Sequence, residues 1–179
     1  MIAIRSEHPP DIAAREALLD IAYGPVRFEK PSQRLREGRA PALAFVATEH
    51  GHVVGTVRLW PVSAGAGRPA LLLGPLAVAS DCRRRGIGAA LMRQAIRAAR
   101  LAGHAAVLLV GDAAYYGRFG FSAAKTAALS IAGLAEPDRL LALELAPGAL
   151  DGARGPIRSG AARRPVRRTA ASIPAARAA

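Results

Sequence analysis

The pattern of apolar residues changes its period in the middle of the chain. Residues 71–78 are almost continuously apolar, which predicts a buried strand. A short polar stretch follows at 80–85. From Ala89 onward, apolar side chains recur at helical spacings, which is typical of the buried face of a helix. We therefore predict a strand, a turn and a helix over about 86–102, with Gly103 as the helix C-cap.

Strands and helices are also predicted on both sides of this unit. Residues 105–110 form an apolar strand that should lie parallel to 71–78, because a strand–helix–strand connection is a crossover. Pro75 cannot donate to a sheet ladder, so it predicts a bulge or an edge. The other predicted elements are a strand at 2–5, a helix at 12–22 capped by Asp11, a short helix at 31–37, a hairpin of strands 43–48 and 53–62, and strands at 127–134 and 139–145.

The turn after residue 80 has the composition of a phosphate site. The first turn of a helix leaves backbone N–H groups without partners, and the helix dipole adds partial positive charge there. Gly86 and Gly88 would let a ligand approach these groups, and the arginines at 83–85 add charge. The spacing excludes the motifs G-x-x-x-x-G-K-[ST] and G-x-G-x-x-G. A pyrophosphate socket and an ordinary solvated helix start remain the two interpretations.

A second informative segment is 105–121, which reads AAVLLVGDAAYYGRFGF. A buried strand there is followed by Tyr116 and then by Gly120 and Phe121. This tyrosine, together with R-x-x-G-x-G after a strand, resembles the acetyl-CoA-binding core of the GNAT superfamily of N-acetyltransferases, especially its small bacterial members, over roughly residues 1–146. The resemblance implies an α/β (α+β) fold, with a mixed central sheet of about six to seven strands, splayed at strands 4 and 5 and flanked by about four helices.

The resemblance also implies a reaction, which is acetyl transfer from acetyl-CoA to a primary amine by direct attack in a ternary complex. Such a protein mainly holds the two substrates together and stabilises the developing oxyanion. The bulge at Pro75 would open a gap for the pantetheine arm, a backbone N–H of Leu76 or Ala77 would face the thioester oxygen, and Tyr116 would protonate the departing thiolate. Contacts to acetyl-CoA are carried over to Leu76, Ala77, Val78, Arg83, Arg84, Arg85, Gly86, Ile87, Gly88 and Ala89.

The acceptor side is expected in the region of the first helices. That region holds an aromatic and charged cluster of Tyr23, Arg27, Phe28, Glu29 and Lys30. Phe28 and Glu29 are the predicted substrate contacts, with ordinary surface charge as the alternative. Residues 70–79 contain no ionisable side chain, so the general base remains open between Glu29, Asp112, a histidine and a water relay.

Composition limits the remaining possibilities. A single cysteine excludes an intramolecular disulfide, and His50 and His52 lack a third partner in sequence, so we expect no metal. No apolar run approaches the roughly 20 residues that span a bilayer. The N-terminus also lacks a signal-peptide pattern. We therefore expect a cytoplasmic protein without membrane contact.

Half of the formal net charge of +12 lies in the last part of the chain. Residues 151–179 hold seven arginines and one acidic residue, and their only large aliphatic residues are Ile157, Val166 and Ile173. We therefore predict a folded domain at 1–150 and a disordered basic tail at 151–179.

Two other functions remain open on the sequence. One is a GNAT-fold module that binds CoA or a regulatory ligand without turnover. The other is binding of nucleic acid or another polyanion through the tail and Arg83, Arg84 and Arg85. Only 4% of the chain is aromatic, so we expect at most weak nucleic-acid contact, through the tail. The expected partner is a small-molecule or peptide amine, and the resemblance also allows a homodimer.

Overall fold

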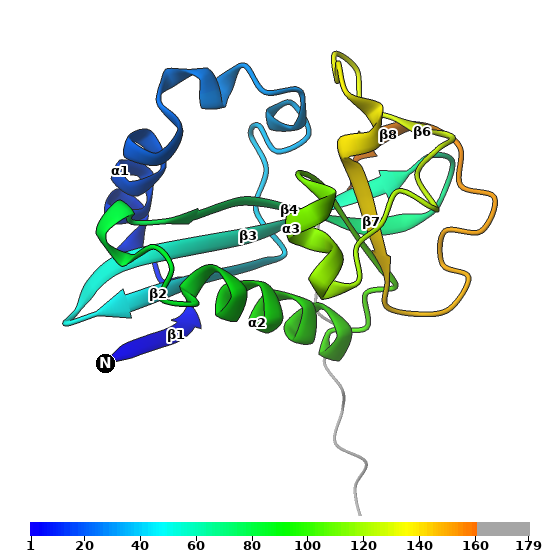
Figure 1. Cartoon of the computed structure of the whole chain (residues 1–179). Helices are drawn as coiled ribbons and strands as arrows, with labels where there is room; N and C mark the ends of the chain where they lie inside the picture. The colour runs from blue at the N-terminus through cyan, green and yellow to red at the C-terminus, as the bar shows by residue number, and fades with distance from the viewer. Residues whose placement is uncertain (161–179) are drawn as a thin grey trace, which may run out of the picture.

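A mixed β-sheet organises the structure, a computed structural model that describes residues 1–160 (Figure 1). Its main path runs β1-β2-β3-β4-β5-β7, with β4 and β5 as the parallel pair. The strands are β1 (Ile2–Ser6), β2 (Leu43–Glu49), β3 (His52–Ala64), β4 (Pro69–Val78), β5 (Ala106–Val110), β6 (Leu129–Ser130), β7 (Leu140–Glu144) and β8 (Gly155–Ser159). The α-helices are α1 (Asp11–Tyr23), α2 (Ile87–Leu101) and α3 (Ala113–Tyr116). The 3-10 turns are η1 (Pro25–Phe28), η2 (Pro31–Gln33), η3 (Ser80–Cys82), η4 (Gly117–Phe119) and η5 (Pro137–Arg139).

The parallel strands β4 and β5 pair over only a short length and then separate. Leu71 pairs with Val107 and Leu72 with Leu108, and the ladder has no further pairs. Beyond this point the second half of β4 has β3 on one side and, within residues 1–160, no strand on the other. The predicted splay between the fourth and fifth strands is therefore confirmed.

A bulge in β4 accompanies the separation. The register places Gly74 and Pro75 opposite the single residue Arg58 of β3. The indole N–H of Trp60 donates to the carbonyl oxygen of Gly74 at 2.7 Å, so this bulge carbonyl has a partner. The bulge predicted from Pro75 is present, and its position is tied to β3 by a side-chain hydrogen bond.

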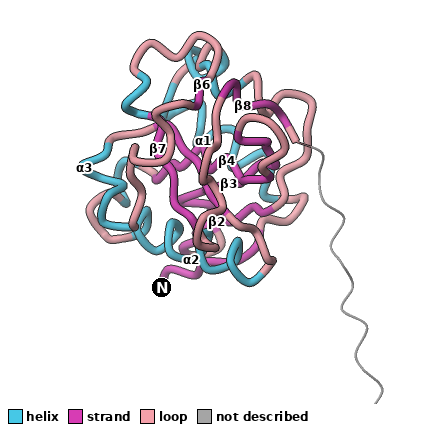
Figure 2. The backbone as a smooth tube through the Cα atoms, turned by 90° about the vertical axis from the view of Figure 1, so that its right-hand side faces the viewer, coloured by secondary structure: helices cyan, strands magenta, loops and turns pink. Residues whose placement is uncertain are grey.

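The two long helices cover opposite faces of the sheet, and both views place α2 below the strands (Figures 1 and 2). α2 buries an apolar stripe that includes Leu91 and Ala95 against the strands β1 to β4. α1 packs Leu18 and Leu19 beside Ala77 of β4. Because β4 lies between the two helices, its backbone is held from both faces.

The folded part of the chain extends beyond the boundary that composition predicted at residue 150. β8 pairs antiparallel with the end of β3 and parallel with β6. Ala153 and Ile157 are 8% and 5% exposed and belong to a second apolar core. The prediction of disorder is therefore wrong for 151–160, because neighbouring strands supply the rest of a core that this stretch could not form alone. The predicted tail at 161–179 lies outside the described residues.

The predicted α/β class is confirmed, with some differences in its elements. The described part of the chain contributes eight strands to the sheet, since β6 and β8 add to the main path. The described residues form three α-helices, because residues 31–37 make the 3-10 turn η2 and further turns. Only two side chains of that segment are buried, so it has no continuous face to bury as a helix. Asp11 lies inside the first turn of α1, where its carboxylate accepts from the backbone N–H of His8, and is not the N-cap.

Two classes of feature are missing from residues 1–160. None of their helices combines the length and the apolar character that crossing a bilayer requires. No three of their His, Cys, Asp or Glu side chains gather as metal ligands would.

Candidate active site

The turn between β4 and α2 builds a cavity beside a helix N-terminus. Gly86, just before the helix, has φ 77°, a left-handed conformation that glycine adopts without strain. An added Cβ there would meet no atom within 4 Å, so the turn is open to a ligand. The cavity has a volume of about 450 Å³, and the exposed Arg83 and Arg84 lie at its wall. Free N–H groups of a first helical turn and guanidinium groups are the donors that anions prefer in proteins.

Most of the residues assigned to the cofactor from the sequence meet at this cavity. Its lining includes Val78, Arg83, Arg84, Gly86, Ile87, Gly88 and Ala89. The side chain of Ile87 is itself buried in the core, so it offers backbone only. These seven residues come from one continuous stretch of chain that ends β4 and begins α2.

Arg85 does not line this cavity, and its predicted cofactor contact is corrected. Its guanidinium forms two hydrogen bonds with Glu49 at the end of β2, at 2.9 and 2.7 Å. The bidentate pair raises the pKa of Arg85 and lowers that of Glu49. Arg118 lies at the cavity in its place, with its guanidinium 4.0 Å from the Tyr115 ring centroid.

Tyr115 also lies at the wall of this cavity. Its ring is half-buried, and an added Cβ at Gly88 would lie 3.1 Å from its hydroxyl oxygen. The second glycine of the turn thus leaves room for this hydroxyl. Neither Tyr115 nor Arg118 carries a sequence signal for this role, because both are brought to α2 by the path of β5.

Three cavities follow one another along β4. A cavity of about 200 Å³ shares Val78, Gly88 and Tyr115 with the phosphate cavity. It shares Tyr23 and Leu76 with a third cavity, of about 100 Å³, at whose wall Tyr116 lies. The row therefore leads from the N-terminus of α2 through the gap between β4 and β5 to a tyrosine.

The backbone direction along β4 decides which N–H groups face the gap. The N–H of Ala79 donates to the carbonyl oxygen of Val54, so these two residues form a hydrogen-bonded pair at the end of the β3–β4 ladder. In an antiparallel ladder such pairs alternate with pairs that are not hydrogen-bonded. Because of this alternation, the backbone of Ala77, two residues before Ala79, is hydrogen-bonded to β3. The backbone N–H and C=O groups of Leu76 and Val78 therefore point away from β3. Of the two oxyanion donors predicted, the geometry favours the N–H of Leu76 over that of Ala77. The carbonyl of Leu76 accepts a hydrogen bond from the Tyr23 hydroxyl.

The ring of Tyr116 is held tightly at the end of the row. An added Cβ at Gly111 would lie 2.2 Å from Cε2 of Tyr116, so the ring occupies the space that a side chain at Gly111 would fill. Tyr115 and Phe121 pack edge-on against it, with centroids at 4.9 and 6.2 Å. Burial, with smaller effects of nearby tyrosines, raises the pKa of Tyr116 to about 12. The phenol therefore stays protonated at neutral pH and is a donor.

Three residues of the predicted acceptor cluster line the third cavity, namely Tyr23, Arg27 and Lys30. Phe28 and Glu29 do not line it, and the Phe28 residue is 58% exposed. The prediction of Phe28 and Glu29 as substrate contacts is thus wrong for this cavity. Sequence reasoning missed Ser32, Gln33 and Arg36, which also line it.

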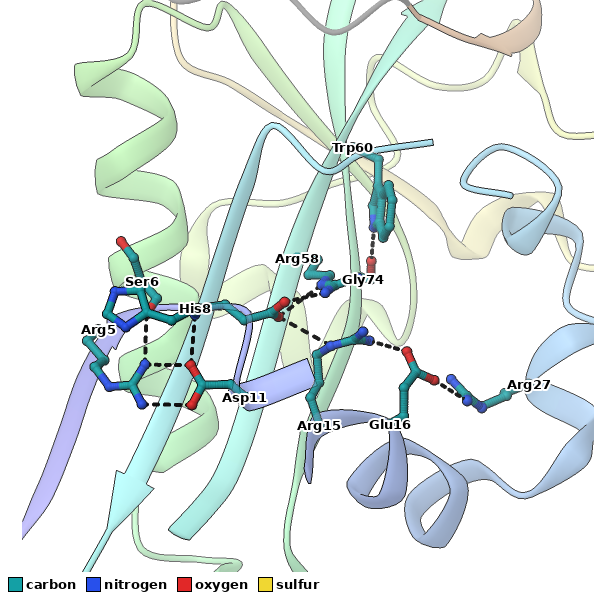
Figure 3. A network of polar contacts seen from close by, with 11 residues as sticks. Arg5, Ser6, His8, Asp11, Arg15, Glu16, Arg27, Arg58, Trp60 and Gly74 are labelled. Carbon is teal, nitrogen blue, oxygen red and sulfur yellow. Dashed lines mark hydrogen bonds and ion pairs between the residues drawn. The ribbon is translucent and has the colours of Figure 1, made fainter. Parts of the chain in front are cut away.

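Arg27 is held by acidic residues of α1. Its guanidinium pairs with Glu16 and lies 2.9 Å from Asp20. Glu16 also pairs with Arg15 (Figure 3). Arg15 in turn pairs with Glu7, which continues the chain of ion pairs. The charge of Arg27 is therefore compensated inside the protein.

The residues considered as general bases do not line the three cavities. None of the residues that line these three cavities in the described part of the chain is Asp, Glu or His. Glu29 and Asp112 are therefore not at the cavity walls, and the carboxylate of Asp112 caps α3 by accepting from Ala114 N–H. Of the alternatives left open by the sequence, a relay through water fits this arrangement.

Comparisons with known proteins agree with this geometry. The chain is 35% identical over 123 residues to an uncharacterised N-acetyltransferase, YhbS, of Escherichia coli, covering 68% of this chain and 74% of that protein. The crystal structure of YhbS from Escherichia coli in complex with CoA matches with a TM-score of 0.77 and 31% identity, over 89% of each chain.

A second solved structure, a GNAT family acetyltransferase from Brucella melitensis in complex with acetyl-CoA, matches with a TM-score of 0.66. It is 31% identical and covers 90% of this chain and 97% of its own. The sequence model of the Acetyltransferase (GNAT) family matches residues 13–121, which span β4, the turn, α2 and Tyr116. The chain therefore belongs to the GNAT acetyltransferase family.

Proposed function

We propose that the protein is an N-acetyltransferase that transfers the acetyl group of acetyl-CoA to a primary amine by direct attack in a ternary complex. The observation that carries the proposal is the row of three cavities between the N-terminus of α2 and Tyr116. The acceptor is a small-molecule or peptide amine. A cytoplasmic location follows from the proposal, since acetyl-CoA is a cytoplasmic metabolite.

The residues present fit the parts of acetyl-CoA by chemistry. Arg83, Arg84 and the N–H groups at the start of α2 match a pyrophosphate. The backbone of Val78 offers a donor and an acceptor to the amides of the pantetheine arm, as an added strand would. Anchoring the phosphates far from the reacting carbon holds the thioester in place without further contacts.

In the proposed reaction, the amine nitrogen attacks the thioester carbonyl carbon, a C–N bond forms and the C–S bond breaks. The N–H of Leu76 donates to the carbonyl oxygen as negative charge develops on it. The Tyr116 hydroxyl donates to the departing sulfur and supplies the proton of the free thiol. The amine loses a proton to water in the cavity, and water returns a proton to the Tyr116 phenolate. This relay matches the lack of a carboxylate or imidazole among the described residues at the cavity wall.

The first experiment is thermal unfolding of the full chain with and without acetyl-CoA. A ligand at one hundred times its dissociation constant adds about 2.7 kcal/mol of stability. Gly86→Glu should abolish the shift, because it places a carboxylate where the phosphates bind. The matched control is Gly103→Glu, since Gly103 has φ 76° and equally open space at the other end of α2. A folded wild-type protein that shows no shift would remove the basis of the proposal.

The second step of this experiment measures thiol release from acetyl-CoA with a panel of primary amines. Tyr116→Phe should lower kcat about 100-fold, the scale of a lost acid catalyst, while the thermal shift with acetyl-CoA is kept. A protein that binds acetyl-CoA and releases no thiol with any amine would instead be the non-catalytic CoA-binding module.

A further inference from the structure

Arg36 is a buried cation at the third cavity. It is 8% exposed, and it lines this cavity together with Tyr23 and Tyr116. Two of its bonds are local: Nε donates to the Ser32 carbonyl at 3.1 Å and Nη2 to the Ser32 hydroxyl at 2.7 Å. A guanidinium has five N–H donors, so several remain for a ligand. No ion pair joins Arg36 to an Asp or Glu within residues 1–160.

Arg15, the other buried arginine among residues 1–160, has the opposite surroundings. Arg15 is 4% exposed and pairs with Glu7 at 3.3 Å and with Glu16 at 2.6 Å (Figure 3). Removing a guanidinium from water costs free energy that such carboxylates offset. Arg36 bears this cost without a carboxylate in the described chain, so a ligand is the remaining source of an anion.

The neighbouring cations increase this excess of positive charge. Lys30 lines the same cavity, and its pKa is lowered by burial and by Arg36 and Arg139. Burial lowers the pKa of Arg36 to about 10, so Arg36 remains a cation at neutral pH. Arg27 also lines the cavity, but its charge is compensated by the acids of α1. Arg36 and Lys30 are thus the uncompensated charges that face the cavity.

We propose that the acceptor amine carries a carboxylate or phosphate group and that Arg36, with Lys30 beside it, binds this anion. The inference rests on the proposed function, in which the thioester lies between Leu76 and Tyr116 at the same cavity. Arg36, Leu76 and Tyr116 line the same cavity of about 100 Å³, so the anion and the amine of the acceptor are separated by few bonds, as in an amino acid. Polycationic acceptors would be repelled.

The anion of the acceptor is separate from the phosphates of CoA. Those phosphates have their own site at the opposite end of the row, at Arg83 and Arg84. The acyl group is the other source of a carboxylate near Tyr116, as in succinyl-CoA. The two sources are distinguished by whether replacing Arg36 impairs the use of the acceptor or the use of the acyl donor.

The kinetic test uses α-amino acids, each compared with its own amide, and acetyl-CoA as donor. A charge-assisted hydrogen bond predicts that kcat/KM is about 10- to 100-fold higher for the acid than for the amide. Arg36→Met should bring this ratio close to one, and Arg36→Lys should restore part of it. Arg34→Met is the matched control, because Arg34 is exposed in the same segment and does not line the cavity. Equal kcat/KM for acid and amide in the wild type, or a preference that survives Arg36→Met, overturns the proposal.

A binding test separates this proposal from the proposed function. With CoA saturating its own site, N-acetylglycine and N-acetylglycinamide are titrated calorimetrically into wild type and Arg36→Met. In wild type, N-acetylglycine should bind at least about 10-fold more tightly than N-acetylglycinamide. Arg36→Met should lose this preference. Equal affinities overturn the anion site. An absence of acetyl transfer together with a preference for N-acetylglycine would contradict the proposed function and support the anion site.

Two further results would also overturn the proposal. If Arg36→Met raises KM for succinyl-CoA and leaves the acceptor ratio unchanged, the anion belongs to the acyl donor. If Arg36→Met lowers the melting temperature and reduces kcat/KM equally for acid and amide, the role of Arg36 is structural.

Discussion

At the scale of single residues, the absent side chain of Gly111 determines where the ring of Tyr116 lies. A Cβ at this position would lie 2.2 Å from Cε2 and 2.7 Å from Cδ2 of that ring, which is far inside van der Waals contact. The ring cannot shift freely, because Tyr115 and Phe121 pack against it. The phenol is thus positioned by Gly111, the residue that directly follows β5.

Gly111→Ala is therefore expected to displace the Tyr116 hydroxyl and to lower kcat at least about tenfold, since misplacing a catalytic group by an ångström is costly. The thermal shift with acetyl-CoA should be kept, because the phosphate cavity lies at the other end of the row. Gly117→Ala is the control, since Gly117 has φ −57° and nothing within 4 Å of an added Cβ. Unchanged kcat in Gly111→Ala would show that Tyr116 does not need this placement.

At the scale of elements, α1 is tied to the edge of the sheet by a carboxylate in its first turn. Asp11 accepts from the Arg5 guanidinium of β1 at 2.6 and 2.8 Å and from the His8 N–H at 2.7 Å (Figure 3). The other end of the same helix carries Tyr23, whose hydroxyl donates to Leu76. The position of α1 therefore affects the backbone of Leu76, whose N–H is the candidate oxyanion donor.

The Arg5 hydrogen bond, followed by that from His8, lowers the pKa of Asp11 to about 2 from 3.8. Because the folded-state pKa is depressed, the stabilisation is complete above pH 4 and is lost as the pH falls through 2. The difference in unfolding free energy between wild type and Asp11→Asn should shrink by about 1 kcal/mol between pH 5 and 2, a value that allows for solvent screening of Arg5.

Urea denaturation at several pH values measures this difference. Glu37→Gln is the control, since Glu37 is exposed and no ion pair engages it within the described residues. A pH-independent difference between wild type and Asp11→Asn would mean that Asp11 is not held as a carboxylate.

At the scale of the whole molecule, the segment 151–160 closes the far end of the sheet. β8 pairs with both β3 and β6 and buries Ile157. A Cβ at Gly65 would lie 2.1 Å from the Arg154 carbonyl oxygen, so the β3–β4 connection packs directly on this segment. The segment is part of the domain's structure even though its composition is polar and basic.

A chain that ends at residue 150 should therefore be less stable than one that ends at 160, by at least about 3 kcal/mol, the usual cost of losing one buried isoleucine. Urea denaturation of both chains measures this difference. In the full chain, Ile157→Ala should lose stability, and Arg158→Ala, at the exposed neighbouring position, should not. Equal stability of the two shortened chains would refute a structural role for β8.

The sequence by itself determined the parts of this protein that depend on neighbouring residues. The strand, turn and helix around Gly86 follow from an apolar run, a left-handed glycine and a helical apolar period, all within one stretch. The hairpin of β2 and β3 and the bulge at Pro75 are local in the same sense. Tyr116 was found through the motif that it shares with the family.

The tertiary structure decided what depends on partners far apart in the chain. Arg85 looked equivalent to Arg83 and Arg84, but Glu49 engages it across the fold. Composition indicated disorder at 151–160, yet strands from elsewhere complete its core. Arg36 became a candidate only when folding placed it, without a carboxylate, at the cavity of Tyr116. Short-range conformational preferences are encoded in adjacent residues, whereas burial, charge compensation and strand partners exist only once distant segments have packed together.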